Sequence, residues 1–240
     1  MKSSAIPKAP AKLQIAVIDS GWDRALVDPR VLRGVGLVHP SDEFALHYSD
    51  DDRDRIGHGT ACSRIILGLA SNVSIVPVRI FGRRLEASVE QLVAALHWAL
   101  EQGVQLINLS LATLRDDALV PLYGICEEAT HRGTIIVAAA FPPGERGYPA
   151  VFDNAIGVRA GRVPSPNAFR YRSDAPVECI AFGRPPGSAP KVTGRARWGT
   201  NSLAAARVTA LIAQFRRRVP NAGLAETRAW LSRTAAVNPL

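Results

Sequence analysis

The chain has 240 residues, 47% of them hydrophobic, and a formal net charge of +8 from 29 Lys and Arg against 21 Asp and Glu. This length and apolar fraction suffice for one large core. The basic residues are scattered and form no aromatic-interleaved stripe, which argues against a nucleic-acid partner. No stretch approaches the about 18 continuous apolar residues of a membrane span.

The three cysteines, Cys62, Cys126 and Cys179, are too few and too widely spaced for a disulfide framework, and no Cys/His metal spacing occurs. We therefore expect buried free thiols in a reducing compartment, and neither a metal nor a cofactor. The first twelve residues lack the apolar core of a secretory signal. A cytoplasmic location is the simplest expectation.

Residues 1–12 are predicted to be a flexible segment, and 13–240 a single domain. The apolar run 13–18 predicts a buried strand that ends at an Asp-Ser-Gly turn. Residues 35–38 predict a second, shorter strand. Residues 41–56 are polar and rich in aspartate, and we expect them to form a solvated loop.

The rest of the chain alternates between helix and strand patterns. Ser88 is the expected N-cap of a helix that stops at Gly103. Strand and helix alternating over short loops predict an α/β fold: a three-layer sandwich whose mostly parallel central sheet has helices on both faces. Helices are predicted at 58–69, 89–100, 121–132, 203–218 and 225–235, and strands at 73–80, 104–111, 134–140, 155–158 and 177–181.

Three polar residues stand where parallel sheets place their functional groups. Asp19 follows the first strand, His58 begins a helix within Gly-His-Gly-Thr, and Ser202 stands at the start of a long helix. Histidine can take the proton of a serine hydroxyl near neutral pH, and a carboxylate can orient the imidazole. The three residue types therefore suit acyl transfer.

The sequence around these residues resembles the subtilisin family. The segments 15–21, 57–60 and 202–208 are similar to its aspartate, histidine and serine motifs, in the family's order Asp, His, Ser. The resemblance runs from residue 13 to the end and implies a subtilisin-like fold and a serine endopeptidase of the compact, intracellular type. By the same resemblance Asp19, His58 and Ser202 are the catalytic triad. Residues Ser110, Leu111 and Ala112 belong to the substrate-binding segment.

The sequence departs from the family where an oxyanion-hole asparagine is expected. Ala140 is followed by Phe-Pro-Pro instead of Gly-Asn. The backbone N–H of Ser202 remains as a donor, and Asn201 and Asn154 are the candidates for a second one. The segment 65–74 also lacks the family's inserted calcium loop, which supports the expectation of no metal.

Four interpretations of the function stay open at this stage. The first is a monomeric peptidase that acts on peptide or protein substrates, with the cutting of a specific precursor peptide as an attractive role. A ligase or macrocyclase would use the same acyl-enzyme. A pseudoenzyme that binds peptides is suggested by the lost asparagine, although it would not need all three triad residues. A nucleic-acid-binding α/β domain rests on net charge alone.

Overall fold

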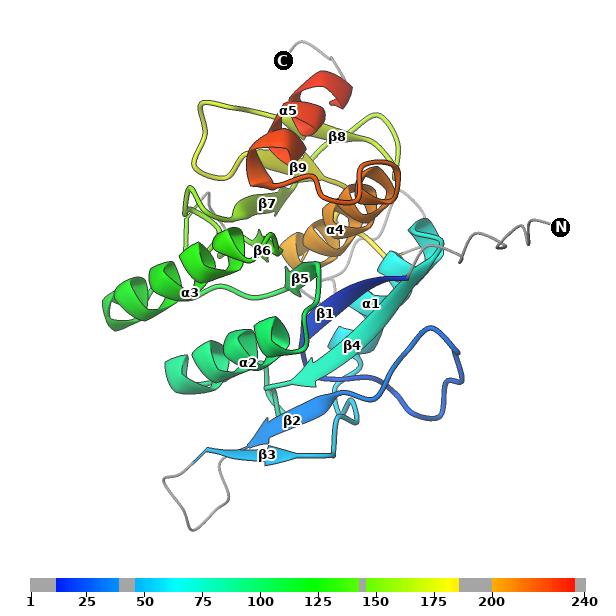
Figure 1. Ribbon diagram of the computed structural model, residues 1–240, viewed down its shortest axis with the longest axis vertical. Coiled ribbons are helices and arrows are strands. Elements are labelled where there is room, and N and C mark those ends of the chain that lie inside the picture. Colours follow the sequence, from blue (N-terminus) through cyan, green and yellow to red (C-terminus); the bar gives the residue numbers. More distant parts are fainter. Residues whose placement is uncertain (1–11, 39–45, 143–145, 186–199, 236–240) are drawn as a thin grey trace, which may run out of the picture.

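The computed structural model describes residues 12–38, 46–142, 146–185 and 200–235. Within them, nine strands form one sheet in the order β3-β2-β4-β1-β5-β6-β7-β9-β8 (Figure 1). The strands are β1 (Leu13–Asp19), β2 (Val35–Val38), β3 (His47–Ser49), β4 (Val73–Arg79), β5 (Leu106–Leu109), β6 (Ile135–Ala139), β7 (Ile156–Ala160), β8 (Phe169–Tyr171) and β9 (Cys179–Ala181). The pairs β2–β3 and β8–β9 at the two edges are antiparallel, and the other pairs are parallel.

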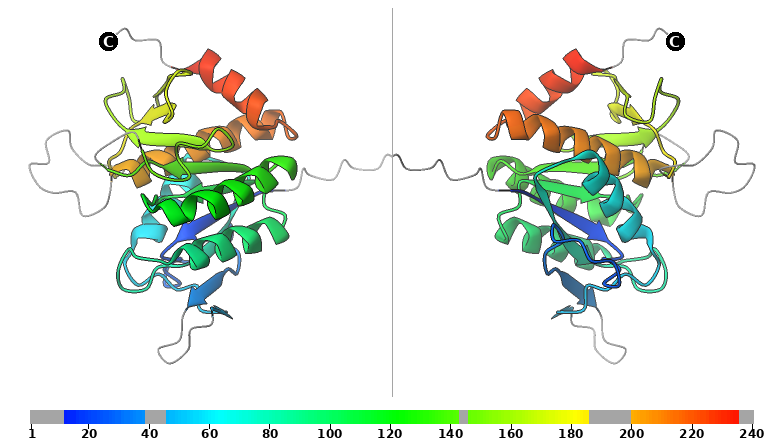
Figure 2. Two further views of the ribbon diagram at one scale, coloured as in Figure 1. Left: turned by 90° about the vertical axis from the view of Figure 1, so that its left-hand side faces the viewer. Right: turned by 90° about the vertical axis from the view of Figure 1, so that its right-hand side faces the viewer.

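Helices cover both faces of the sheet, so the expected three-layer architecture is confirmed (Figure 2). They are α1 (His58–Leu69), α2 (Val89–Glu101), α3 (Leu119–His131), α4 (Thr200–Arg218) and α5 (Leu224–Thr234), with a short 3-10 turn at Asp116–Ala118. The central strands have apolar side chains on both sides: Ile15 and Val17 join the core with α1 and α4, while Ala16 and Ile18 join the core with α2 and α3. Two-sided burial explains why these strands are continuous apolar runs.

Helix α5 packs on the outside of α4 and beside the β8–β9 hairpin. Trp230 stacks on Phe215 of α4 with ring centroids 4.7 Å apart, and on Phe169 of β8 at 6.2 Å. Arg228 of the same helix pairs with Glu178, which is buried directly before β9. These contacts attach the last helix to the sheet edge.

The structure differs from the sequence-based expectation at several boundaries. Helix α4 begins at Thr200, so Ser202 lies within its first turn instead of just before it. Strand β3 lies inside the stretch expected to be a loop, and β8 was not expected. The predicted flexible segment falls, except for Lys12, outside the described residues.

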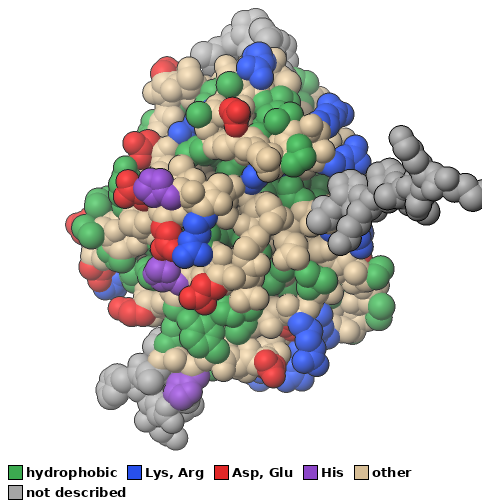
Figure 3. Space-filling model, in the orientation of Figure 1, with side chains coloured by type: hydrophobic (Ala, Val, Ile, Leu, Met, Phe, Trp, Pro, Cys, Tyr) green, Lys and Arg blue, Asp and Glu red, His purple; other side chains and the backbone are tan. Residues whose placement is uncertain are grey.

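The surface has the mixed character expected from the composition. On the face drawn in Figure 3, Lys and Arg side chains lie among acidic and apolar ones and form no continuous stripe. None of the helices in the described ranges has the length and apolar character needed to cross a bilayer.

Candidate active site

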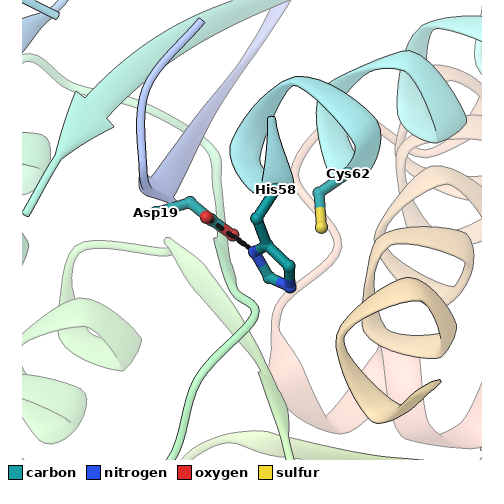
Figure 4. A group of neighbouring side chains, drawn as sticks. All are labelled: Asp19, His58 and Cys62. Atoms are coloured by element: carbon teal, nitrogen blue, oxygen red, sulfur yellow. Dashed lines mark hydrogen bonds and ion pairs between the residues drawn. The ribbon is translucent and has the colours of Figure 1, made fainter. Parts of the chain in front are cut away.

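Asp19 and His58 form a buried pair at the carboxyl edge of the sheet (Figure 4). Asp19 is the last residue of β1, and His58 is the first residue of α1. The imidazole Nδ1 donates to both carboxylate oxygens, at 2.7 and 2.8 Å, and the two residues are 0% and 1% exposed. Because an ionised carboxylate can only accept, the hydrogen of the neutral ring is on Nδ1, and Nε2 carries the lone pair.

The surroundings of His58 raise its pKa above the ordinary value of 6.5. Burial is the largest single effect and lowers the pKa, because it disfavours the imidazolium. The charge and hydrogen bond of Asp19, together with the charge of Asp54, more than offset it. The imidazole is thus a stronger base than an isolated histidine, which suits a group that must accept a proton.

Two aspartates of the acidic run are bonded into the fold, so the expectation of a solvated loop is wrong for them. Asp54 accepts from the backbone N–H groups of Gly57 and Thr60, at 2.7 and 2.9 Å, and from the Thr60 hydroxyl at 2.6 Å. Asp52 is 4% exposed and pairs with Arg24. The first N–H groups of a helix need acceptors. The Asp54 carboxylate accepts from the N–H groups on both sides of His58 and so fixes the backbone that positions the imidazole.

A glycine allows α1 to approach the end of β1. A Cβ at Gly59 would lie 2.5 Å from the carbonyl oxygen of Gly21 and 3.2 Å from the Cβ of Asp19. The Gly59 N–H donates to Ser20 Oγ at 2.8 Å. A side chain at this position would push the helix away and lengthen the hydrogen bonds between His58 and Asp19.

Ser202 is held against the end of β5 by a buried polar network. Its Oγ donates to the carbonyl of Ser110 at 2.9 Å, and the Ser110 hydroxyl donates to the Ser202 carbonyl at 3.2 Å. Asn108 donates to Ser110 Oγ at 2.8 Å and accepts from Thr209 Oγ1 at 2.9 Å. Asn108 and Thr209 were missed as site residues, although an asparagine in the apolar run 104–111 was a signal.

Most of the predicted site residues line one cavity of about 400 Å³. Its lining includes His58 and Ser202 together with Ser110, Leu111 and Ala112. Residues from three distant parts of the chain therefore face the same space, as the parallel topology leads one to expect.

The two candidate asparagines for the oxyanion hole lie near opposite ends of strand β7. Asn201 lines the cavity; its Nδ2 donates to the Ala140 carbonyl at 2.9 Å, and its Oδ1 accepts from the Ala160 N–H at 2.8 Å. Asn154 precedes β7 and donates to the Tyr123 carbonyl at 3.2 Å. It is six residues before Ala160, or about 20 Å along a strand, so Asn154 drops out as a candidate.

The segment that replaces the expected Gly-Asn offers little to a developing oxyanion. Phe141 uses its N–H in a 2.8 Å hydrogen bond to the Arg146 carbonyl, and Pro142 has no N–H. Both residues line the cavity.

One group near the site has the composition of a metal site. Ligand atoms of Asp19, His58 and Cys62 lie within 4.8 Å of one another, and the Cys62 thiol stands beside the imidazole one turn along α1 (Figure 4). Burial, followed by the charge of Asp19, raises the pKa of this thiol well above 9.0. The protonated thiol and the Asp19–His58 hydrogen bonds form a compact buried group beside the cavity.

All three cysteines are free and buried, as the sequence led us to expect.

Comparison with known proteins identifies the family of the chain. Residues 11–239 match the subtilase family. The chain is 26% identical over 234 residues to alkaline elastase YaB of Bacillus sp. (strain YaB), which covers 93% of this chain and 59% of that protein. It is 27% identical over 241 residues to subtilisin DY of Bacillus licheniformis, covering 94% and 84%.

Solved structures show the same fold at lower identity. A cold adapted subtilisin-like serine proteinase superposes with a TM-score of 0.68 at 18% identity, over 93% of this chain and 84% of that one. A protease from Pseudoalteromonas arctica gives a TM-score of 0.70 at 18% identity, over 95% and 84%. With a family match over nearly its whole length, the chain belongs to the subtilase family of subtilisin-like serine peptidases.

Proposed function

We propose that this chain is a serine endopeptidase that works through an acyl-enzyme on Ser202. The observation that carries the proposal is the buried pair of Asp19 and His58, whose imidazole lines the same cavity as the serine hydroxyl. A carboxylate on Nδ1 leaves Nε2 as the base, which is the arrangement that serine activation requires.

Each member of the triad has a distinct role in this proposal. Ser202 Oγ exchanges its hydrogen bond to the Ser110 carbonyl for one to Nε2 of His58, gives up its proton there and attacks the substrate carbonyl. The imidazolium then protonates the leaving amine, and water repeats the sequence to release the acid. Asp19 keeps the ring in the Nδ1–H form and stabilises its positive charge.

The oxyanion is assigned two donors. The first is the backbone N–H of Ser202, which lies in the first turn of α4, where N–H groups have no partner within the helix. The second is the side chain of Asn201. Its carbonyl oxygen is fixed by Ala160 and one amide hydrogen is used by Ala140, which leaves the other amide hydrogen for the cavity.

The substrate is proposed to be one precursor peptide or protein, cut in the cytoplasm. The three buried free cysteines are compatible with a reducing compartment. Cell fractionation followed by detection of the protein checks the location, and a membrane or secreted fraction would contradict it.

The activity is tested with a mixed library of peptides and the variants Ser202→Ala, His58→Ala and Asp19→Asn. The wild type is expected to cleave, and each variant to lose about 10⁴-fold or more in kcat. Mass spectrometry distinguishes the outcomes, because hydrolysis adds one water to the products whereas ligation joins two fragments without it. A folded wild type that binds peptides and cleaves none would favour the peptide-binding pseudoenzyme.

A further inference from the structure

The cleft beside Ser202 contains a gap between two segments of chain. Strands β5 and β6 are hydrogen-bonded neighbours as far as Leu109 and Ala138. Beyond them the segments 110–113 and 139–142 separate, and both line the cavity. The nucleophile stands at the mouth of this gap, because Ser202 Oγ contacts the carbonyl of Ser110 on one side.

Asn201 marks the opposite side of the same mouth. Its side-chain amide is bonded to the carbonyl of Ala140, at the end of β6. A peptide carbonyl attacked by Ser202 would therefore lie at the mouth of the gap, and the gap is the space between these two segments that could receive the side chain on the adjacent α-carbon.

A third segment is hydrogen-bonded to both of these segments. Tyr148 exchanges two backbone hydrogen bonds with Thr113, at 2.8 and 3.0 Å, and Arg146 accepts the N–H of Phe141 at 2.8 Å. The chain from Arg146 to Tyr148 thus lies between the two walls. Gly147, in the middle, is buried and has a φ of +100°.

The space at this level is too narrow for a side chain. A Cβ placed on Gly147 would lie 2.8 Å from the Cβ of Phe141 and 3.2 Å from the Cβ of Ala112. Those two Cβ atoms are therefore at most 6.0 Å apart. A carbon atom directly between them would be crowded, because a van der Waals contact needs about 3.5–4.0 Å to each.

We propose that Phe141, Ala112 and Gly147 restrict the residue that donates the scissile carbonyl to glycine, alanine or serine. This inference rests on the proposed peptidase function. The restriction is local, because the cavity as a whole, at about 400 Å³, has room for several residues. The enzyme thus selects a small residue at one position of an otherwise extended substrate.

The test uses peptidyl diphenyl phosphonates that differ only in the residue next to phosphorus, alanine or phenylalanine. Ser202 Oγ bonds to phosphorus, phenoxide leaves, and the serine proton passes to His58. The alanine probe is expected to react at least tenfold faster, since one excess methylene group in a closed pocket changes kcat/KM by about 10- to 200-fold. Equal rates, or a faster phenylalanine probe, would overturn the inference.

Two variants and two controls complete the design. Phe141→Gly is expected to reduce the alanine preference by about tenfold, and Ala112→Gly serves if the first variant does not fold. Val120→Ala, on an exposed position of α3, should keep the wild-type ratio. A fluorophosphonate without a peptide part separates the two hypotheses. If it fails to label the wild type, the peptidase function is overturned as well. If it labels the wild type while the peptidyl phosphonates react faster with phenylalanine than with alanine, only the size restriction is overturned.

Discussion

Replacing Asn201 by alanine tests how this chain stabilises the oxyanion without the usual asparagine. If the Asn201 amide donates to the oxyanion, its removal should lower kcat by about 10²–10³-fold, or about 2.7–4 kcal/mol of transition-state stabilisation. KM should change little, because the donor acts on charge that develops during the reaction.

The same substitution also removes structural hydrogen bonds, and their effect can be separated. Asn201 bonds to Ala140 at 2.9 Å and to Ala160 at 2.8 Å. At about 0.5–1.5 kcal/mol each, their loss costs about 1–3 kcal/mol of unfolding free energy. For a chain of this size that lowers Tm by about 2–12 °C.

Asn154→Ala is the matched control, since it also removes an asparagine bonded to a backbone carbonyl, that of Tyr123. Steady-state kinetics on a cleaved peptide are measured for both variants well below their Tm. Asn154→Ala should keep the wild-type kcat, while Asn201→Ala should lose two to three orders of magnitude. A kcat for Asn201→Ala within threefold of wild type would refute the assigned role.

Three further predictions concern the supports of the site and the fold. Asp54→Asn should move the acidic limb of the kcat/KM profile to lower pH, because the aspartate charge raises the pKa of the His58 imidazole; a move to higher pH would contradict this. Arg228→Ala leaves buried Glu178 without its ionic partner and should cost about 3–5 kcal/mol in urea unfolding, whereas exposed Arg233→Ala should stay within about 0.5 kcal/mol. EGTA should leave Tm unchanged, because the short link 70–72 between α1 and β4 has no room for a calcium loop; a drop of several degrees would contradict it.

Local patterns were sufficient for most of the fold. Ser88 was expected to cap α2, and it forms a capping box in which its hydroxyl accepts from the N–H of Gln91 at 3.1 Å. The central strands were equally evident, because burial on both faces leaves continuous apolar runs. Strand β8 was missed, since its three residues are held by pairing with β9, a contact that no local pattern encodes.

The site was predictable where chemistry resides in a short motif and unpredictable where it depends on distant partners. Asp19, His58 and Ser202 each lie in a recognisable segment. The hydrogen bond between Asn108 and Thr209 joins residues 101 positions apart, so the sequence marks Asn108 as unusual in an apolar run but does not identify its partner. Asn154 was chosen for its residue type, and its place at the far end of β7 became evident from the sheet.

The central claim is that Ser202 is a nucleophile activated by His58 and Asp19. Its most direct test is covalent labelling with a fluorophosphonate, followed by peptide mapping of the adduct. One equivalent of label is expected on Ser202 of the wild type, with none on Ser202→Ala and a strongly reduced rate for His58→Ala. A folded wild type that remains unlabelled, or label that persists in Ser202→Ala, would contradict the account.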